Sequence, residues 1–130
     1  MTTPRRRDGD RGAASLVVAI VTPAVLVLLM LSVQAGIFWH AHQRADAAAT
    51  RAAAAAARED GTATDGHNAA NALLAGAPLD NATVTVTRDT DQAQATVTGT
   101  APALVPGVVW QVQATAEAPV ERFIPETERQ

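Results

Sequence analysis

Residues 12–43 read GAASLVVAIVTPAVLVLLMLSVQAGIFWHAHQ, a run of 32 residues without a charged side chain in a chain of 130. The apolar part, residues 13–39, would form a helix about 40 Å long at a rise of about 1.5 Å per residue. A bilayer core of about 30 Å needs roughly 20 helical residues, so this segment is long enough to span one. We therefore predict a transmembrane helix over residues 13–39.

The flanks of this segment predict its orientation. Residues 1–12 hold four arginines and two aspartates, whereas residues 40–130 hold six arginines and eleven acidic residues. Basic flanks stay on the cytoplasmic side, so we expect a cytoplasmic basic leader, residues 1–12, and an extracytoplasmic C-terminus. Trp39 suits an aromatic anchor at the outer interface. Pro23 lacks a backbone N–H and is expected to kink the helix within the membrane.

A cleaved secretory signal is the alternative to a retained membrane span. Val33, Gln34 and Ala35 fit the small-x-small pattern of a signal-peptidase site, and a basic region precedes the apolar run. The run is longer than an ordinary signal segment, and helix-forming sequence continues beyond it, which favours a retained span. On the alternative, the product is a secreted or anchored extracytoplasmic binding module released near Ala35.

The residues that follow predict a continuation of the same helix. Residues 40–60 are dense in alanine and contain neither glycine nor proline, and alanine is the best helix former. We expect this extracytoplasmic extension to reach about residue 60, with Gly61 as its stop.

The extension has two unlike sides. Arg44, Arg51 and Arg58 recur every seven residues and share one stripe of the helix. The other side is nearly all alanine and would let a second helix approach closely, as small residues do between membrane helices. The predicted helix-packing residues are Ala45, Ala48, Ala49, Ala52, Ala53 and Ala56. The alternative is that the alanines reflect composition alone and the arginines only solvate the helix.

Residues 61–130 predict a small α+β head. A short helix is expected from about residue 67 to residue 75, with Asp65 as its N-cap and Gly76 at its end. Alternation of apolar and polar residues predicts three antiparallel strands, and a turn at residues 89–91 joins the first two. The three strands cover residues 82–88, 92–98 and 108–118.

The sheet needs a cover on its apolar face, and only the short helix or the alanine side of the long helix is available. Large apolar residues are few outside the membrane segment, so we expect a marginal core that neighbouring subunits complete. The large apolar residues outside the membrane segment are Leu73, Leu74, Leu79, Val84, Val86, Val97, Val108, Trp110, Val112, Phe123 and Ile124.

Composition argues against an enzyme and against cofactors. The chain has no Cys, no Lys and no Tyr, and its two serines lie in the apolar run. Thiolate metal sites, lysine phosphate loops and Schiff bases are therefore excluded. His40 and His42 are two residues apart and point in different directions on a helix, so we predict no metal site. Acidic residues outnumber arginines in residues 40–130, which disfavours nucleic acid as a partner.

The N-terminus resembles that of TadE-like pilus assembly proteins, which are minor pseudopilins of tight-adherence (Flp) secretion systems. The resemblance lies in the arginine-rich leader ending in Asp10-Arg11-Gly12 and in the following Ala-Ala-Ser-Leu-Val-Val-Ala-Ile-Val-Thr-Pro. The tail, residues 118–125 (APVERFIP), is similar to the end of actinobacterial members.

The resemblance implies cleavage by a prepilin peptidase after Gly12, which leaves Ala13 as the new N-terminus. It also implies pilin-like or assembly-machinery subunits as partners in the lipid bilayer. Separately from the resemblance, we expect no small-molecule substrate. Family members often carry Glu followed by an aromatic residue at the fifth and sixth mature positions, where this chain has Val17 and Val18. A pseudopilin or pilus assembly component is therefore the leading interpretation. The binding module is the second and an accessory subunit of an enzyme the third.

Overall fold

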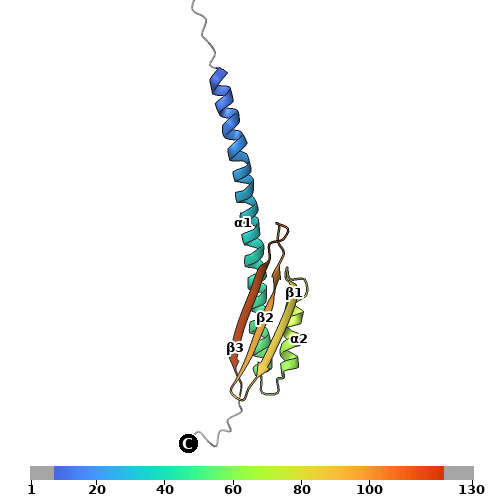
Figure 1. Cartoon of the computed structure of the whole chain (residues 1–130). Helices are drawn as coiled ribbons and strands as arrows, with labels where there is room; N and C mark the ends of the chain where they lie inside the picture. The colour runs from blue at the N-terminus through green and yellow to red at the C-terminus, as the bar shows by residue number, and fades with distance from the viewer. Residues whose placement is uncertain (1–7, 122–130) are drawn as a thin grey trace, which may run out of the picture. The chain divides into compact units, whose positions relative to one another are not determined.

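A computed structural model of the chain describes residues 8–121, and the side chains of residues 12–121. The chain divides into two compact units, Met1–Ala35 and Gly36–Gln130, which we describe separately. The elements are α1 (Asp8–Ala57), α2 (Ala63–Leu74), β1 (Asp80–Arg88), β2 (Gln92–Ala101) and β3 (Trp110–Pro119) (Figure 1). The predicted α+β class, with a long N-terminal helix, a short helix and a three-stranded antiparallel sheet, is confirmed.

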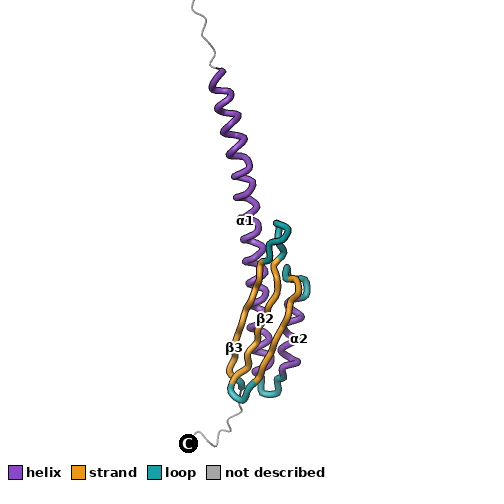
Figure 2. Tube along the Cα trace, in the orientation of Figure 1, coloured by secondary structure: helices purple, strands orange, loops and turns teal. Residues whose placement is uncertain are grey.

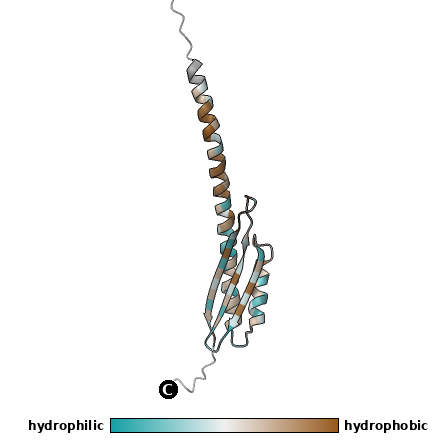
Figure 3. Ribbon diagram, viewed as in Figure 1, coloured by the Kyte–Doolittle hydropathy of each residue, from teal (hydrophilic) through white to brown (hydrophobic). Residues whose placement is uncertain are grey.

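In the first unit, the apolar side chains of α1 are exposed. Leu16, Ile20 and Leu28 have exposed fractions of 64–66%, and Figure 3 shows strongly hydrophobic residues along this part of the helix. The Ser32 hydroxyl donates to the Leu28 carbonyl oxygen at 2.8 Å, so this polar side chain is satisfied within the helix. Pro23 lies inside α1, and the kink expected there stays a prediction.

In the second unit, the sheet has the order β1-β2-β3 with antiparallel pairing throughout (Figure 2). The Asp89 N–H donates to the Gln92 carbonyl oxygen at 2.8 Å and closes the predicted turn. The first two strands are longer than predicted. The third strand begins at Trp110 instead of residue 108. The chain just before it forms a turn in which Gly107 has a φ of 84°, and this turn delays the start of the strand.

The core of the second unit is built mainly from alanine. The side of α1 that faces the core is almost completely buried, as are the inward-facing residues of the sheet. The buried residues of α1 are Ala41, Ala45, Ala48, Ala49, Ala52, Ala53, Ala56 and Ala57, at 0–3% exposed. Those of the sheet are Val86, Ala93, Ala95, Val97, Ala101, Val112 and Ala114. The cover expected from the alanine side of the long helix is therefore present.

Large side chains contribute less to this core than expected. Val97 and Val112 are the largest fully buried side chains of the described residues. Val108 and Trp110, which were predicted to face inward, are 42% and 36% exposed. Leu73, Leu74, Leu79 and Val84 pack against the core while partly exposed, and Phe123 and Ile124 lie outside the described residues.

Helix α2 begins at a capping box. Thr62 is the N-cap and accepts from the Asp65 N–H at 3.2 Å, while the Asp65 carboxylate accepts from the Thr62 N–H at 2.8 Å and from its hydroxyl at 2.6 Å. These hydrogen bonds hold the pKa of the Asp65 carboxyl below its ordinary value. The expected N-cap at Asp65 and helix start near residue 67 are thus wrong. Thr62 is the cap because its hydroxyl oxygen accepts from the Asp65 N–H, while the Asp65 carboxylate accepts from the Thr62 N–H.

Gly66 brings α2 against α1. A Cβ at this position would lie 2.8 Å from the Ala52 carbonyl oxygen and 3.3 Å from the Ala56 Cβ, both in α1. Only glycine permits so close an approach between the two helices.

The C-terminus of α1 is capped by groups distant in the sequence. Arg88, at the end of β1, donates through Nη1 to the carbonyl oxygens of Ala56 at 2.6 Å and Arg58 at 2.9 Å, and also to that of Gly61. The Glu121 N–H donates to the Ala57 carbonyl oxygen at 2.9 Å. Terminal carbonyls of a helix need such donors, and a cation there also complements the helix dipole. The helix ends at Ala57, a little before the expected residue 60.

Substitution of Ala52 by Leu should destabilise the second unit by about 1–3 kcal/mol, because the larger side chain overpacks a closed core. Urea unfolding of the detergent-solubilised Trp39→Phe chain, followed by Trp110 fluorescence, measures this change. Ala54→Leu is the matched control, since Ala54 is exposed on the same helix. Equal midpoints for the two variants would contradict the alanine core.

Arg88→Gln should lower the free energy of unfolding by about 2 kcal/mol, because it removes charged donors from several helix-end carbonyls. Arg88→Lys should restore part of the loss, and Arg58→Gln should have little effect because that side chain is exposed. The same urea titration measures all three. An Arg88→Gln midpoint equal to that of the parent chain would refute the proposed cap.

Thr62→Ala should raise the pKa of Asp65 toward its ordinary value, because the hydroxyl that donates to the carboxylate is lost. A lowered pKa in the folded state stabilises the fold above the unfolded-state pKa and ceases to do so as the pH falls through the folded-state value. Carboxyl-carbon NMR titration of Asp65 measures the shift. Thr64→Ala, one residue inside α2, serves as the control and should leave the titration unchanged.

Candidate functional site: helix α1 and the surfaces of the head

Gly12 and Ala13, the predicted processing site, lie inside α1 and are exposed. A Cβ added at Gly12 would meet no atom within 4 Å. No described group therefore shields this peptide bond, although a peptidase would have to unwind the helix locally to bind it. Cleavage here stays a prediction.

The fifth and sixth positions after that bond present no carboxylate. Val17 and Val18 are 58% and 61% exposed, and residues 12–43 hold no charged side chain at all. A neighbouring subunit's N-terminal amine would find no acidic partner on this part of the chain.

One helix among the described residues, Gly12–Ala57, is long and apolar enough to cross a membrane. Its first part presents large aliphatic side chains to the surroundings, with Val25, Leu26 and Leu29 at 48–60% exposed. Exposed apolar surface of this extent on a helix is expected to meet lipid or other apolar helices.

The six predicted helix-packing residues lie together on the buried side of α1. Ala45, Ala48, Ala49, Ala52, Ala53 and Ala56 are each 0–1% exposed. The close approach that small residues permit is made here by the chain's own sheet and by Gly66 of α2. A helix of another subunit would reach these alanines only if the sheet moved away.

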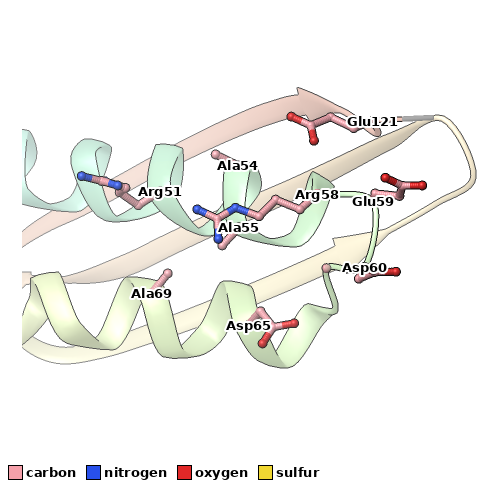
Figure 4. Close-up of a pocket in the computed structure, with 10 residues that line it drawn as sticks. Arg51, Ala54, Ala55, Arg58, Glu59, Asp60, Asp65, Ala69 and Glu121 are labelled. Carbon is pink, nitrogen blue, oxygen red and sulfur yellow. The ribbon is translucent and has the colours of Figure 1, made fainter. Parts of the chain in front are cut away.

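The arginine stripe faces outward. Arg44, Arg51 and Arg58 are all exposed, and the last two line an open depression of about 700 Å³ beside the N-terminal turn of α2 (Figure 4). Asp65 and Glu121 line the same depression, and the charge of Arg58 contributes to the lowered pKa of Asp65. Both signs of charge thus share an open, exposed surface, which gives no single class of ligand a favoured site.

The histidines do not converge. His42 stacks on Phe38 with ring centroids 6.2 Å apart, whereas His67 lies on α2. Within the part of the chain that the structure describes, no group of three or more His, Cys, Asp or Glu side chains could hold a metal ion.

Sequence reasoning missed two features of the head. Arg88 was not recognised as a cap, because nothing local indicates that a residue ending a strand reaches the end of a helix 30 residues earlier. The loop between β2 and β3 was given no role in the sequence analysis, yet it exposes several large apolar side chains. Its composition, PALVPGVV with no charge, was the signal that could have identified it.

Comparison with known proteins identifies the N-terminal helical part of the chain. The family model described as TadE-like protein matches residues 12–58, from the predicted processing site to just beyond the end of α1. The match does not reach the tail, residues 118–125, on which the actinobacterial resemblance depends. No curated protein and no solved structure matches the chain. Residues 12–58 are thus similar to the TadE-like family, in agreement with the predicted resemblance of the N-terminus.

Proposed function

We propose that this chain is a single-pass, membrane-anchored pseudopilin or pilus assembly component of a tight-adherence type secretion system. One observation carries the proposal: the TadE-like segment, residues 12–58, coincides with the helix Gly12–Ala57 that is apolar and long enough to span a membrane. The N-terminus would lie in the cytoplasm and the head outside, because positive flanks stay inside.

The proposed activity is association and not catalysis. Large aliphatic side chains along residues 13–35 are available to lipid and to the apolar helices of other pilin-like subunits. Van der Waals packing is the main attraction between such helices in a bilayer. We assign the helix contacts to this segment, because the alanine side of the extension is occupied by the chain's own sheet.

We further propose that a prepilin peptidase removes residues 1–12. The family match begins at Gly12, and glycine before the cleaved bond gives the peptidase an unhindered backbone. The new N-terminus at Ala13 would lie at the cytoplasmic end of the anchor. Because Val17 replaces the carboxylate that sets axial register between subunits, this chain would either prime assembly from the membrane or enter a fibre sparsely.

A secreted or anchored binding module is the second candidate, and one observation favours it. The compact second unit begins at Gly36, immediately after the signal-peptidase pattern that ends at Ala35. Cleavage there would release the complete head, including the whole alanine side of α1 from Ala41 onward.

The mature N-terminus distinguishes these proposals. In a host that expresses the cognate prepilin peptidase, we expect a membrane-bound chain that begins at Ala13, as measured by intact mass after cell fractionation. Gly12→Leu should retain residues 1–12, whereas Gly36→Leu, the control, should be processed normally. A chain that begins at Gly36 and is free in the medium would overturn the anchor. A membrane-bound chain with residues 1–12 intact would overturn the processing step alone.

A further inference from the structure

The loop between β2 and β3, residues 102–109, carries an exposed apolar patch together with the first residue of β3. Leu104, Val105, Val108, Val109 and Trp110 have exposed fractions of 46, 38, 42, 69 and 36%. We call these five residues the loop patch. Large apolar side chains clustered at one loop tip indicate an interaction site more often than singly scattered ones do.

The loop patch lies beside the start of the second unit's helical segment. The rings of Trp110 and Phe38 have centroids 5.9 Å apart and are tilted by 55°. Trp39, the next residue, is 65% exposed. Phe38 and Trp39 end the apolar run that began at Ala13. The patch therefore adjoins the residues at which the proposed membrane span leaves the bilayer.

Charge is absent around the patch in the sequence and gathers at the opposite ends of the strands. No charged residue occurs between Asp91 and Glu117. At the far ends, by contrast, Arg88 ends β1, Asp89 and Asp91 lie in the β1–β2 turn, and Gln94 is paired with Glu117. Asp80 is the charged residue of the sheet nearest the patch, and it pairs with Thr100 of β2. Burial of the loop tip would thus require little desolvation of charge.

We propose that the loop patch inserts into the outer interfacial layer of the bilayer and forms a second membrane contact of the head. This inference depends on the proposed membrane anchor. Tryptophan and aliphatic side chains favour the boundary between headgroups and acyl chains. An irregular loop cannot enter the hydrocarbon core with unsatisfied backbone groups, so the contact is interfacial.

The backbone of the loop is suited to the interfacial layer of the bilayer. Pro102 and Pro106 have no N–H to satisfy, and the Val108 N–H donates to the Val105 carbonyl oxygen at 3.3 Å within the loop. The pairing of Ala101 with Trp110 closes the base of the loop. Fewer unpaired donors are therefore exposed to the lipid than in an open loop of this length. Lipid is favoured over a second protein surface because the patch lies beside Phe38, at the end of the apolar run, and offers no charged group for an ion pair.

The experiment uses the full chain reconstituted in dioleoylphosphatidylcholine vesicles with or without brominated phosphatidylcholine. The chain has two tryptophans, so Trp39→Phe leaves Trp110 as the reporter and Trp110→Phe leaves Trp39. We expect brominated lipid to remove most of the Trp110 emission, with stronger quenching by bromine near the headgroup than by bromine near the chain end. Thr115→Trp in the doubly substituted chain, an exposed site on β3, should remain unquenched.

Loop variants test whether the patch causes the contact. In the Trp39→Phe background, Val109→Asp should abolish the quenching of Trp110, while Val109→Leu should retain it. Urea unfolding of both variants verifies that the head remains folded, as expected for a side chain that is 69% exposed.

The outcomes separate this inference from the proposed anchor. If the chain does not float with the vesicles, the anchor fails. If the chain floats and Trp39 is quenched while Trp110 is not, the anchor stands and the loop contact is refuted. Unquenched Trp110 emission that lies further to the blue than in the detergent-solubilised chain would also refute it, because a second copy of this chain is then the partner on the patch.

Discussion

The second unit depends on the contact between the buried alanines of α1 and the inner face of the sheet. Eight alanines of α1, from Ala41 to Ala57, are at most 3% exposed, and the strands that cover them present alanine and valine. Side chains this small let the backbones approach closely, but each buries little apolar area. Because the hydrophobic contribution is spread over many small contacts, a larger residue on either surface would separate the layers instead of filling a gap. Close approach at Gly66 extends the same constraint to α2.

A core with few large side chains leaves more of the stability to polar groups at its ends. Arg88 and the Glu121 N–H attach the ends of β1 and β3 to the last carbonyls of α1. The capping box of Thr62 and Asp65 orders the start of α2 beside them. The hydrogen bonds of Arg88 and of the Glu121 N–H connect segments far apart in the sequence, so they fix where the strands lie along the helix, which a uniform alanine surface does not specify. In a core with larger side chains, the shapes of those side chains would fix the position of the strands along the helix.

The periodicity of apolar residues predicted the helices and strands well, but it did not predict which of them contact one another. Alternation of Val and Thr in residues 82–88 defined a strand because one face had to be apolar, and the structure agrees. The alanine side of α1 was recognised as a packing surface. However, a surface of small residues suits the chain's own sheet and another helix equally well, so the sequence left its partner open. The start of α2 was misplaced because Asp65 can serve as N-cap or as the third residue of a capping box, and Thr62 decides between them. The role of Arg88 depends on tertiary proximity and has no local signal.

The apolar side chains in the two halves of α1 need different surroundings, although the halves form one helix. Residues 13–35 expose aliphatic side chains and bury almost none, so their stability in isolation would require lipid or apolar neighbours. Residues 41–57 bury their apolar side within the head and need neither. The compact unit begins at Gly36, so the head keeps its core whichever proposed bond is cleaved. On the proposed anchor, stable retention in the membrane would therefore depend mainly on which peptide bond is cleaved. Cleavage after Gly12 leaves a head joined to an apolar helix that can associate within a bilayer. Cleavage after Ala35 would leave a head on which, among residues 36–121, the exposed large apolar side chains are Trp39 and the loop patch.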